Sequence, residues 1–348
     1  MRRAKPGSSC GPLSRTGAEA KPPWSAVPRQ VKEEVARVLG SRVARASRIY
    51  GGFAPSATFR LALADGRRAF FKGVSAASNE FMRGALVQEE RVYRELSQFI
   101  RPWAPEFYGS AHVDDWHALL LEDLGPADVP PWTARKTRDA ARAYAEFHRS
   151  TMGRALPEWV TADLLPGEVE NWERVAADDG ALDATASLAG ARASEAHAWL
   201  DAQLPRLRAA SRELLAVTEQ HTLLYLDARG DNVRWNHGQL RIFDWNWVQR
   251  GPVEPDAAAF AEGIAAEGGP APEVFMAEYG RLMPVRAEAL RASVAVLAGF
   301  FARSAPRPPT PGLPRIRSIQ RRQLKICLAW AARLLDLPEP RWLAAVAD

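Results

Sequence analysis

Residues Leu223–Trp247, LLYLDARGDNVRWNHGQLRIFDWNW, give the strongest indication of how this chain folds. Apolar residues over Thr222–Leu226 predict a buried strand. Two short strands, Val233–Trp235 and Leu240–Phe243, follow, and the turn over residues 236–238 favours a hairpin between them. The stretch therefore predicts a small β insert between helical regions, with polar residues placed where its strands end.

Three polar residues in this stretch have the spacing of a phosphoryl-transfer site. Asp227 follows the first strand, Asn232 comes five residues later, and Asp244 ends the hairpin. In such a site one carboxylate accepts the proton of the attacking hydroxyl, and an amide oxygen and a second carboxylate bind Mg²⁺. The spacing matches the kinase loop H-R-D-x-x-x-x-N followed by the D-F-G aspartate. Each residue alone is typical of turns, so the prediction rests on their combination.

The first third of the chain predicts a small antiparallel sheet. Apolar and polar residues alternate over residues 59–63, which is typical of a half-buried strand. Asp-Gly at 65–66 favours a hairpin turn, and Arg68–Lys72 forms the returning strand. Helices are predicted over residues 31–45 and 77–98, and a further strand over Ala118–Leu121.

A lysine and a glutamate in this region complete the predicted nucleotide site. Lys72 is one of only six lysines beside forty arginines, and it ends the returning strand. Glu89 shares a helical stripe with Val92 and Tyr93, which directs it inward. A kinase-like enzyme uses such a pair to position the phosphates of the nucleotide. The alternative is a surface lysine and a solvated acidic residue, and the order of the motifs favours the pair.

The rest of the chain is predicted to be mostly helical. Helical patterns cover residues 135–151 and 191–216, and Pro205 is expected to kink or divide the second. The C-terminal part predicts helices broken by the Pro-rich loop Ser304–Arg315. A basic run follows this loop at helical spacing and is interpreted as a solvated face: Arg315, Arg317, Arg321, Arg322 and Lys325.

The net charge of +5 is concentrated at the N-terminus. Residues 1–30 contain six basic residues and one acidic residue, which accounts for the whole excess, so the remaining body is neutral. This leader is rich in Gly, Pro and Ser and has no hydrophobic signal region. We expect a disordered tail outside the fold rather than a nucleic-acid arm. The two lobes are then expected over residues 31–125 and 126–348.

The sequence predicts no metal site built from cysteine or histidine. Two cysteines, Cys10 and Cys327, form neither a disulfide framework nor a zinc motif. The six histidines are expected to form no metal cluster. No apolar stretch is long enough to span a membrane, so we expect a cytoplasmic protein without a membrane partner.

The sequence resembles the aminoglycoside phosphotransferase and choline kinase-like superfamily, which has a protein-kinase-like fold. The motifs that carry the resemblance are GGFAPSATFRL, FFKG, LVQEERVYREL, LLLEDLG, LLYLDARGDNVRW and RIFDWNWVQRGPVEPD. It implies a two-lobed α+β fold, with a small antiparallel-sheet lobe before a larger helical lobe. It also implies roles for individual residues: catalysis by Asp227, magnesium binding by Asn232 and Asp244, phosphate positioning by Lys72 with Glu89, and adenine binding by the backbone of Glu122 and Leu124.

The chain departs from the family pattern at two places. Tyr225 replaces the usual histidine before the catalytic aspartate, a residue that braces the loop. The glycine loop is weak, so phosphate contacts there would come from backbone N–H groups such as that of Gly52 and from the Ser56 hydroxyl, because Pro55 has no N–H to donate. Asp256 matches a later family aspartate and is interpreted as structural.

Arg229, two residues after the catalytic aspartate, has two interpretations. Its planar guanidinium could stabilise charge on the transferred phosphoryl group. Alternatively, it forms a salt bridge to Asp227 or Asp231. The sequence favours neither.

These features predict an ATP-dependent, Mg²⁺-dependent O-phosphotransferase that acts on a hydroxyl group of a small molecule. An acidic cleft would favour an aminoglycoside, and a neutral or basic cleft would favour a sugar or a nucleoside. The alternative is a nucleotide-binding pseudokinase with a regulatory role, which Tyr225 and the weak glycine loop suggest. The oligomeric state is left open.

Overall fold

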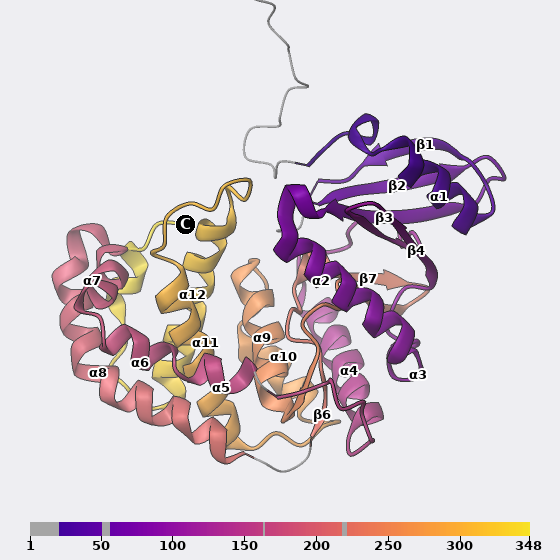
Figure 1. Cartoon of the computed structure of the whole chain (residues 1–348). Coiled ribbons are helices and arrows are strands. Elements are labelled where there is room, and N and C mark those ends of the chain that lie inside the picture. The colour runs from indigo at the N-terminus through magenta and orange to yellow at the C-terminus, as the bar shows by residue number, and fades with distance from the viewer. Residues whose placement is uncertain (1–20, 51–55, 163, 218–220) are drawn as a thin grey trace, which may run out of the picture.

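The computed structural model describes residues 21–50, 56–162, 164–217 and 221–348. Figure 1 shows a small lobe built on a sheet beside a larger lobe built from helices. This is the predicted two-lobed α+β arrangement. None of the helices within the described residues is long and apolar enough to cross a membrane.

The small lobe is built on a five-stranded antiparallel sheet with the order β1-β2-β3-β5-β4. The predicted hairpin is confirmed, because β2 pairs with β3 on either side of the Asp-Gly turn. Two of the strands, β1 and β4, were not predicted. The strands are β1 (Val43–Arg48), β2 (Ala57–Leu63), β3 (Arg68–Ser75), β4 (Phe107–Val113) and β5 (Trp116–Leu121).

The first predicted helix is shorter than expected. Helix α1 (Arg29–Leu39) ends at Gly40, whose φ of 65° lies in the left-handed region. Glycine adopts this conformation without side-chain strain and commonly ends helices. The residues that follow form β1, so the helix expected over residues 31–45 is wrong in its last part.

The expected leader over residues 1–30 is wrong at its C-terminal end, which packs on the sheet. The ring of Trp24 lies 5.1 Å from that of Phe59 and 5.3 Å from that of Phe71, between centroids. Val27 is only 1% exposed in the same cluster. These residues help α1 to bury this face of the sheet and belong to the fold. The first part of the leader lies outside the described residues.

The other face of the sheet packs against α2 (Ala76–Glu95), which is followed by the short α3 (Ser97–Ile100). The helix predicted over residues 77–98 is confirmed except at its end. The side chain of Ser75 caps its N-terminus by accepting from the backbone of Ser78. Residues of α2 predicted to share one stripe are buried: Leu86, Glu89, Val92 and Tyr93.

The larger lobe contains the predicted long helices and several short ones. Helix α8 continues through Pro205 and is not divided. Its helices are α4 (Ala134–Thr151), α5 (Leu164–Val169), α6 (Asn171–Ala176), α7 (Asp179–Ser187), α8 (Ala193–Glu213), α9 (Val253–Ala266), α10 (Pro272–Tyr279), α11 (Ala287–Ser304) and α12 (Ile316–Leu334). Short 3₁₀ turns are η1 (Trp24–Ala26), η2 (Gly190–Arg192), η3 (Leu214–Ala216), η4 (Gly230–Asn232) and η5 (Arg341–Ala345).

The β insert predicted in the larger lobe is present. Strand β6 (Thr222–Leu224) pairs with β9 (Gln249–Gly251). The predicted hairpin consists of β7 (Val233–Asn236) and β8 (Gln239–Ile242). Because β6 ends at Leu224, the segment that carries the polar motif is a loop.

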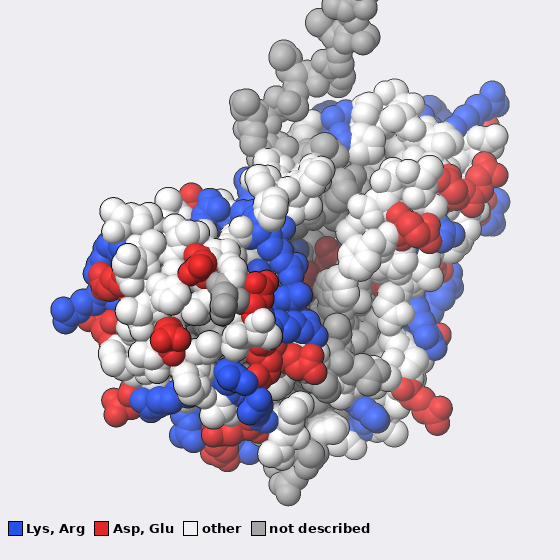
Figure 2. Space-filling view, turned by 60° about the vertical axis from the view of Figure 1, so that its left-hand side comes forward, with Lys and Arg blue, Asp and Glu red and all other residues white. Residues whose placement is uncertain are grey.

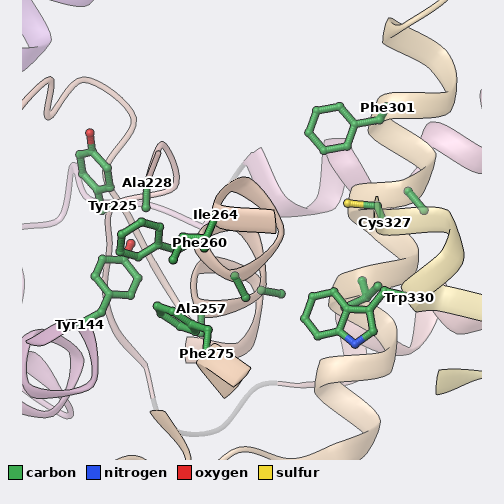
Figure 3. Close-up of a cluster of buried hydrophobic side chains, with 14 of the residues drawn as sticks. Tyr144, Tyr225, Ala228, Ala257, Phe260, Ile264, Phe275, Phe301, Cys327 and Trp330 are labelled. Carbon is green, nitrogen blue, oxygen red and sulfur yellow. The ribbon is translucent and has the colours of Figure 1, made fainter. Parts of the chain in front are cut away.

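Aromatic side chains from α4, α9 and α10 pack beneath this loop. Figure 3 shows Tyr144, Phe260 and Phe275 clustered on the side of Tyr225, with Cys327 and Trp330 farther along the same core. Ring centroids are 5.1 Å apart for Tyr144 and Phe260, and 5.3 Å apart for Phe260 and Phe275. Edge-to-face packing of this kind makes a rigid floor for the loop.

Candidate active site

Residues 225–232, here called the Asp227 loop, are held together by the side-chain amide of Asn232. The Nδ2 atom of Asn232 donates to the backbone oxygen and to Oδ2 of Asp227, both at 3.0 Å. Asn232 is 2% exposed, so this arrangement is fixed by packing. Since the nitrogen is bound to Asp227, the amide oxygen is the atom left to face a cation.

A buried carboxylate holds the start of this loop. Asp256 of α9 accepts hydrogen bonds from the backbone N–H groups of Tyr225 (2.6 Å) and Leu226 (2.9 Å). It also accepts from the Tyr144 hydroxyl at 2.6 Å, and His148 Nε2 lies 3.1 Å away. Leu226 has a φ of 64°, a strained value for a leucine, which these bonds stabilise. Asp256 is therefore structural, as predicted.

Glu267, just after α9, holds the middle of the loop. The N–H of Gly230 donates to Glu267 Oε1 at 3.0 Å, and Trp132 Nε1 donates to Oε2 at 2.7 Å. A Cβ atom on Gly230 would lie 2.3 Å from Glu267 Oε2, so a larger residue there would displace this carboxylate from its contact with the loop. Sequence reasoning missed Glu267, because the contact joins positions 37 residues apart and no local motif marks it.

Tyr225 replaces the expected histidine and keeps a bracing role. Its hydroxyl donates to the backbone oxygen of Phe243 at 2.6 Å. Its ring lies against Trp245, with centroids 4.9 Å apart. Tyr225 therefore connects the Asp227 loop to the segment that carries Asp244.

Arg229 forms both of the salt bridges considered from the sequence. Its Nη1 atom donates to Asp227 at 2.9 Å and its Nε atom to Asp231 at 2.6 Å. Burial works against the charged guanidinium, but Asp227, Asp231 and Asp244 outweigh it and raise the pKa of Arg229. The structure thus contains a fixed positive charge directly beside Asp227.

The environment of Asp227 favours its neutral form. Burial raises the pKa of Asp227, and the nearby Asp244 and Asp231 carboxylates add to this effect, while Arg229 opposes it. The resulting pKa is about 7, far above the usual 3.8. A carboxylate with a pKa near neutrality is well matched to accept a proton from a hydroxyl group.

Lys72 of β3 links the two lobes. Its Nζ atom donates to Glu89 Oε2 of α2 at 2.8 Å and also to Asp244 Oδ1. The second carboxylate oxygen of Glu89 accepts from the backbone N–H of Asp244 at 3.1 Å. Asp244 has a φ of 71°, so its backbone is held in a strained conformation by these contacts. The predicted lysine and glutamate therefore meet, and both bind the predicted third residue.

Mutual attraction keeps Lys72 and Asp244 ionised. Burial would lower the pKa of Lys72, but the carboxylates of Asp244 and Glu89 outweigh it and raise the pKa. Burial likewise disfavours the charged form of Asp244, yet the Lys72 ammonium lowers the pKa of that carboxyl. Lys72 is thus a permanent cation at the boundary of the lobes.

Of the two glycine-loop residues predicted to contact phosphate, Gly52 and Ser56, the structure describes only Ser56. Gly52 lies outside the described residues. The Ser56 side chain is 2% exposed, and its hydroxyl has no hydrogen-bond partner within the described part of the chain. A buried hydroxyl of this kind fits a ligand that offers an acceptor oxygen.

The backbone of the predicted hinge is only partly available. The N–H of Glu122 donates to the backbone oxygen of Glu106 at 2.8 Å, so this group extends the sheet. The Glu122 carboxylate accepts from Asn236 Nδ2 at 3.1 Å. In the backbone of Glu122, only the carbonyl oxygen is therefore left to bind adenine, and the backbone of Leu124 would provide the second binding group.

The residue between them ties the hinge to the sheet. Asp123 has a side chain that is 2% exposed and pairs with Arg60 of β2 and Arg68 of β3, both at 3.1 Å. The Arg60 guanidinium also donates to the backbone oxygen of Gly125. Sequence reasoning missed these contacts, which join the hinge to strands about sixty positions earlier.

The donor atoms fit a magnesium ion. Mg²⁺ prefers hard oxygen ligands, with a few protein groups completed by phosphate and water. The amide oxygen of Asn232 and the carboxylate of Asp244 are groups of this type. The Asp227 loop positions the first, and the strained backbone of Asp244 positions the second. The chemistry of the residues therefore agrees with the predicted ligands.

No protein-family profile and no curated protein matches the chain. Solved structures do match it. An aminoglycoside phosphotransferase from Alicyclobacillus acidocaldarius is 15% identical, with a TM-score of 0.55 over 89% of this chain and 96% of the other. The spectinomycin phosphotransferase APH(9)-Ia, solved with ADP and spectinomycin, is 14% identical, with a TM-score of 0.54 over 91% and 97%.

Choline kinase LicA from Streptococcus pneumoniae is 14% identical, with a TM-score of 0.51 over 86% of this chain and 98% of the other. At these identities the likeness concerns the fold. The chain has the two-lobed, protein-kinase-like fold of these phosphotransferase and choline kinase structures.

Proposed function

We propose that this chain is an ATP-dependent phosphotransferase that transfers the γ-phosphoryl group to a hydroxyl of a small molecule. The observation that carries the proposal is the contact of Lys72 with Asp244, across 172 positions of sequence, beside Asp227 and Asn232. Four residues of the types needed for phosphoryl transfer are thereby brought to one boundary between the lobes. The spectinomycin phosphotransferase of similar fold was solved with ADP, which supports nucleotide use.

The residues have separate tasks in the proposed reaction. Asp227 accepts the proton of the acceptor hydroxyl while that oxygen bonds to the γ-phosphorus and the bond to the β-phosphate oxygen breaks, which releases ADP. Lys72 binds phosphate oxygens and is oriented by Glu89. Asn232 and Asp244 would hold a magnesium ion, which would supply positive charge to the phosphates. Catalysis is then mostly positioning and electrostatic stabilisation.

Both interpretations of Arg229 apply in this reaction scheme. Its bonds to Asp227 and Asp231 orient the guanidinium before substrate arrives. A planar cation held in this way is suited to the equatorial oxygens of the transferred group. The salt bridges and a role in catalysis are therefore compatible.

The charge around the boundary favours a neutral or anionic acceptor over a polycationic aminoglycoside. Figure 2 shows Lys and Arg side chains gathered along the helical-lobe side of the hollow between the lobes. At the loop between α11 and α12, burial and the neighbouring Arg307 lower the pKa of both Arg303 and Arg317, so the local potential is positive. This potential repels a polyamine and attracts a phosphorylated or carboxylated sugar or nucleoside.

The test is phosphoryl transfer by the full chain with Mg-ATP across a panel of neutral, anionic and cationic hydroxyl compounds. We expect turnover with a neutral or anionic acceptor and its loss in Asp227→Asn. Asp201→Asn, a change on the exposed face of α8, serves as the matched control and keeps wild-type turnover. Unchanged turnover in Asp227→Asn would refute the assigned mechanism.

The second candidate function is the nucleotide-binding pseudokinase. ATP binding without transfer to any member of the panel, and without ATP hydrolysis, would favour it. The hydrogen bond from Tyr225 to Phe243 argues against this alternative, because the tyrosine still braces the loop in place of the histidine.

A further inference from the structure

A second polar cluster lies in the small lobe, away from the Asp227 loop. It consists of Glu90 on α2, His112 on β4 and His117 on β5. The two histidines are direct partners across the β4–β5 pair, so their side chains leave the same face of the sheet. Their rings are 4.2 Å apart between centroids, so two of the histidines that were expected to form no metal cluster lie side by side.

The three side chains converge on one point. The Nε2 atoms of His112 and of His117 each lie 3.0 Å from Glu90 Oε2. All three potential ligand atoms lie within 4.8 Å of one another. Ligand atoms around a tetrahedral zinc ion, at about 2.0–2.2 Å from the metal, are about 3.4 Å apart, which lies between the 3.0 Å contacts and the 4.8 Å limit of this cluster.

His117 is the unusual member of the cluster. Its side chain is fully buried, and neither ring nitrogen makes a hydrogen bond of good geometry within the described residues. Buried polar groups are almost always satisfied, so an imidazole left in this state points to a missing partner. Its Nε2 atom faces Glu90 and the neighbouring imidazole, where a cation would be bound.

The charge of Glu90 suits a cation. Burial alone would raise the pKa of Glu90, but close contacts from His117, Ser110 and Arg94 outweigh it and hold the pKa below its usual range. The group is therefore a carboxylate at neutral pH. Glu90 Oε1 is occupied by Ser110 at 2.6 Å and Arg94 at 2.7 Å, which leaves Oε2 for the histidines.

We propose that Glu90, His112 and His117 form a binding site for Zn²⁺, with water as the fourth ligand on the exposed side of His112. Two imidazoles and one carboxylate with an open position are a common zinc ligand set. Magnesium, which prefers oxygen ligands, is not expected to compete for it.

Zinc at this site would stabilise the position of α2. Glu90 adjoins Glu89, the residue that orients Lys72 and the backbone of Asp244. The ion would connect α2 to the β4–β5 pair and restrict its movement over the sheet. Zinc binding would therefore raise thermal stability even without nucleotide.

The direct test titrates the chelator-treated full chain with Zn²⁺ in excess Mg²⁺, with a chromophoric competitor as readout. We expect one equivalent to bind to the wild type, and His112→Ala to weaken binding by at least about tenfold. His112 is largely exposed, so this variant keeps the fold. His197→Ala, at an exposed histidine paired with Asp183, is the matched control and binds as the wild type does.

Co²⁺ provides a readout of the ligands themselves. The wild type should give the intense visible bands of a tetrahedral cobalt site, and His112→Ala should lose them. Arg94→Gln should bind Zn²⁺ several-fold tighter than the wild type, because it removes a cation 2.7 Å from Glu90 Oε1. Equal zinc affinity in the wild type and His112→Ala, or no saturable binding to either, would overturn the proposal.

Discussion

The hydroxyl of Tyr225 donates a 2.6 Å hydrogen bond to the backbone oxygen of Phe243, and it thereby joins the Asp227 loop to the residue before Asp244. The bond spans 18 positions and couples two segments that each supply an expected magnesium ligand. Tyrosine and histidine differ in shape, but both have a flat ring with a polar tip. The brace is therefore retained by a different chemical group.

Tyr225→Phe removes this bond and keeps the ring packed on Trp245. We expect a loss of about 1 kcal/mol in the free energy of unfolding and a larger fall in kcat than in nucleotide affinity, because Asp244 is less firmly held. Denaturant unfolding and steady-state kinetics measure the two effects. Equal kcat values for the variant and the wild type would show that the bond does not position Asp244.

Asp227→Asn should change how stability depends on pH. The folded-state pKa of Asp227, about 7, lies above the usual 3.8, so the wild type loses the contribution of this group as pH rises through that interval. The asparagine does not titrate. With chelator present and no nucleotide, the free energy of unfolding of the variant should rise relative to that of the wild type between about pH 4 and 7. The increase should reach at most about 4 kcal/mol and stay constant at higher pH.

Thermal unfolding of both proteins across this pH range gives the measurement. A difference in Tm that stays constant from acid to neutral pH would contradict the raised pKa of Asp227.

Lys72→Met leaves the Glu89 and Asp244 carboxylates facing each other without a cation. Breaking a buried ion pair in this way costs about 3–5 kcal/mol of stability. The double variant Lys72→Met with Glu89→Gln removes the repulsion, so we expect it to recover part of the loss. Denaturant unfolding of the two variants and of Glu89→Gln alone provides the cycle. A double variant less stable than Lys72→Met would show that repulsion is not the cause.

Trp24→Ala should destabilise the small lobe. The ring packs on Phe59 and Phe71, and loss of a buried tryptophan costs about 3–5 kcal/mol, less here because Trp24 is partly exposed. A chain that begins at Arg29 should lose at least as much, since Val27 is removed as well. A chain that begins at Lys21 is the control, and we expect it to keep the Tm of the full chain. Equal Tm values for both truncated chains would place residues 21–28 outside the stable fold.

The parts of the fold predicted from sequence are those set by short-range pattern. The β7–β8 hairpin and the spacing of Asp227, Asn232 and Asp244 lie within one short segment, where local residue order determines geometry. The β1 strand was missed because residues after Gly40 continue a helical spacing, and only the left-handed glycine ends the helix. Local pattern does not contain the tertiary contacts that decide between the two.

The contacts that support the site are long-range, which explains why they could not be predicted. Glu267 reaches Gly230 because α9 returns beneath the loop, and no motif encodes that return. His112 and His117 meet only because β4 pairs with β5. The irregular pairing near Gly109 hides β4 from a pattern of strict alternation.

The ion pairs of Asp123 with Arg60 and Arg68 have a mechanical consequence. They fasten the hinge to two neighbouring strands, so the hinge must move with the sheet as one rigid body. Any change in the angle between the lobes is then taken up after Gly125, whose φ of 81° marks a sharp turn. Opening would carry an adenine ring away with the small lobe and separate Lys72 from Asp244, so rotation between the lobes would affect group transfer more than retention of the base.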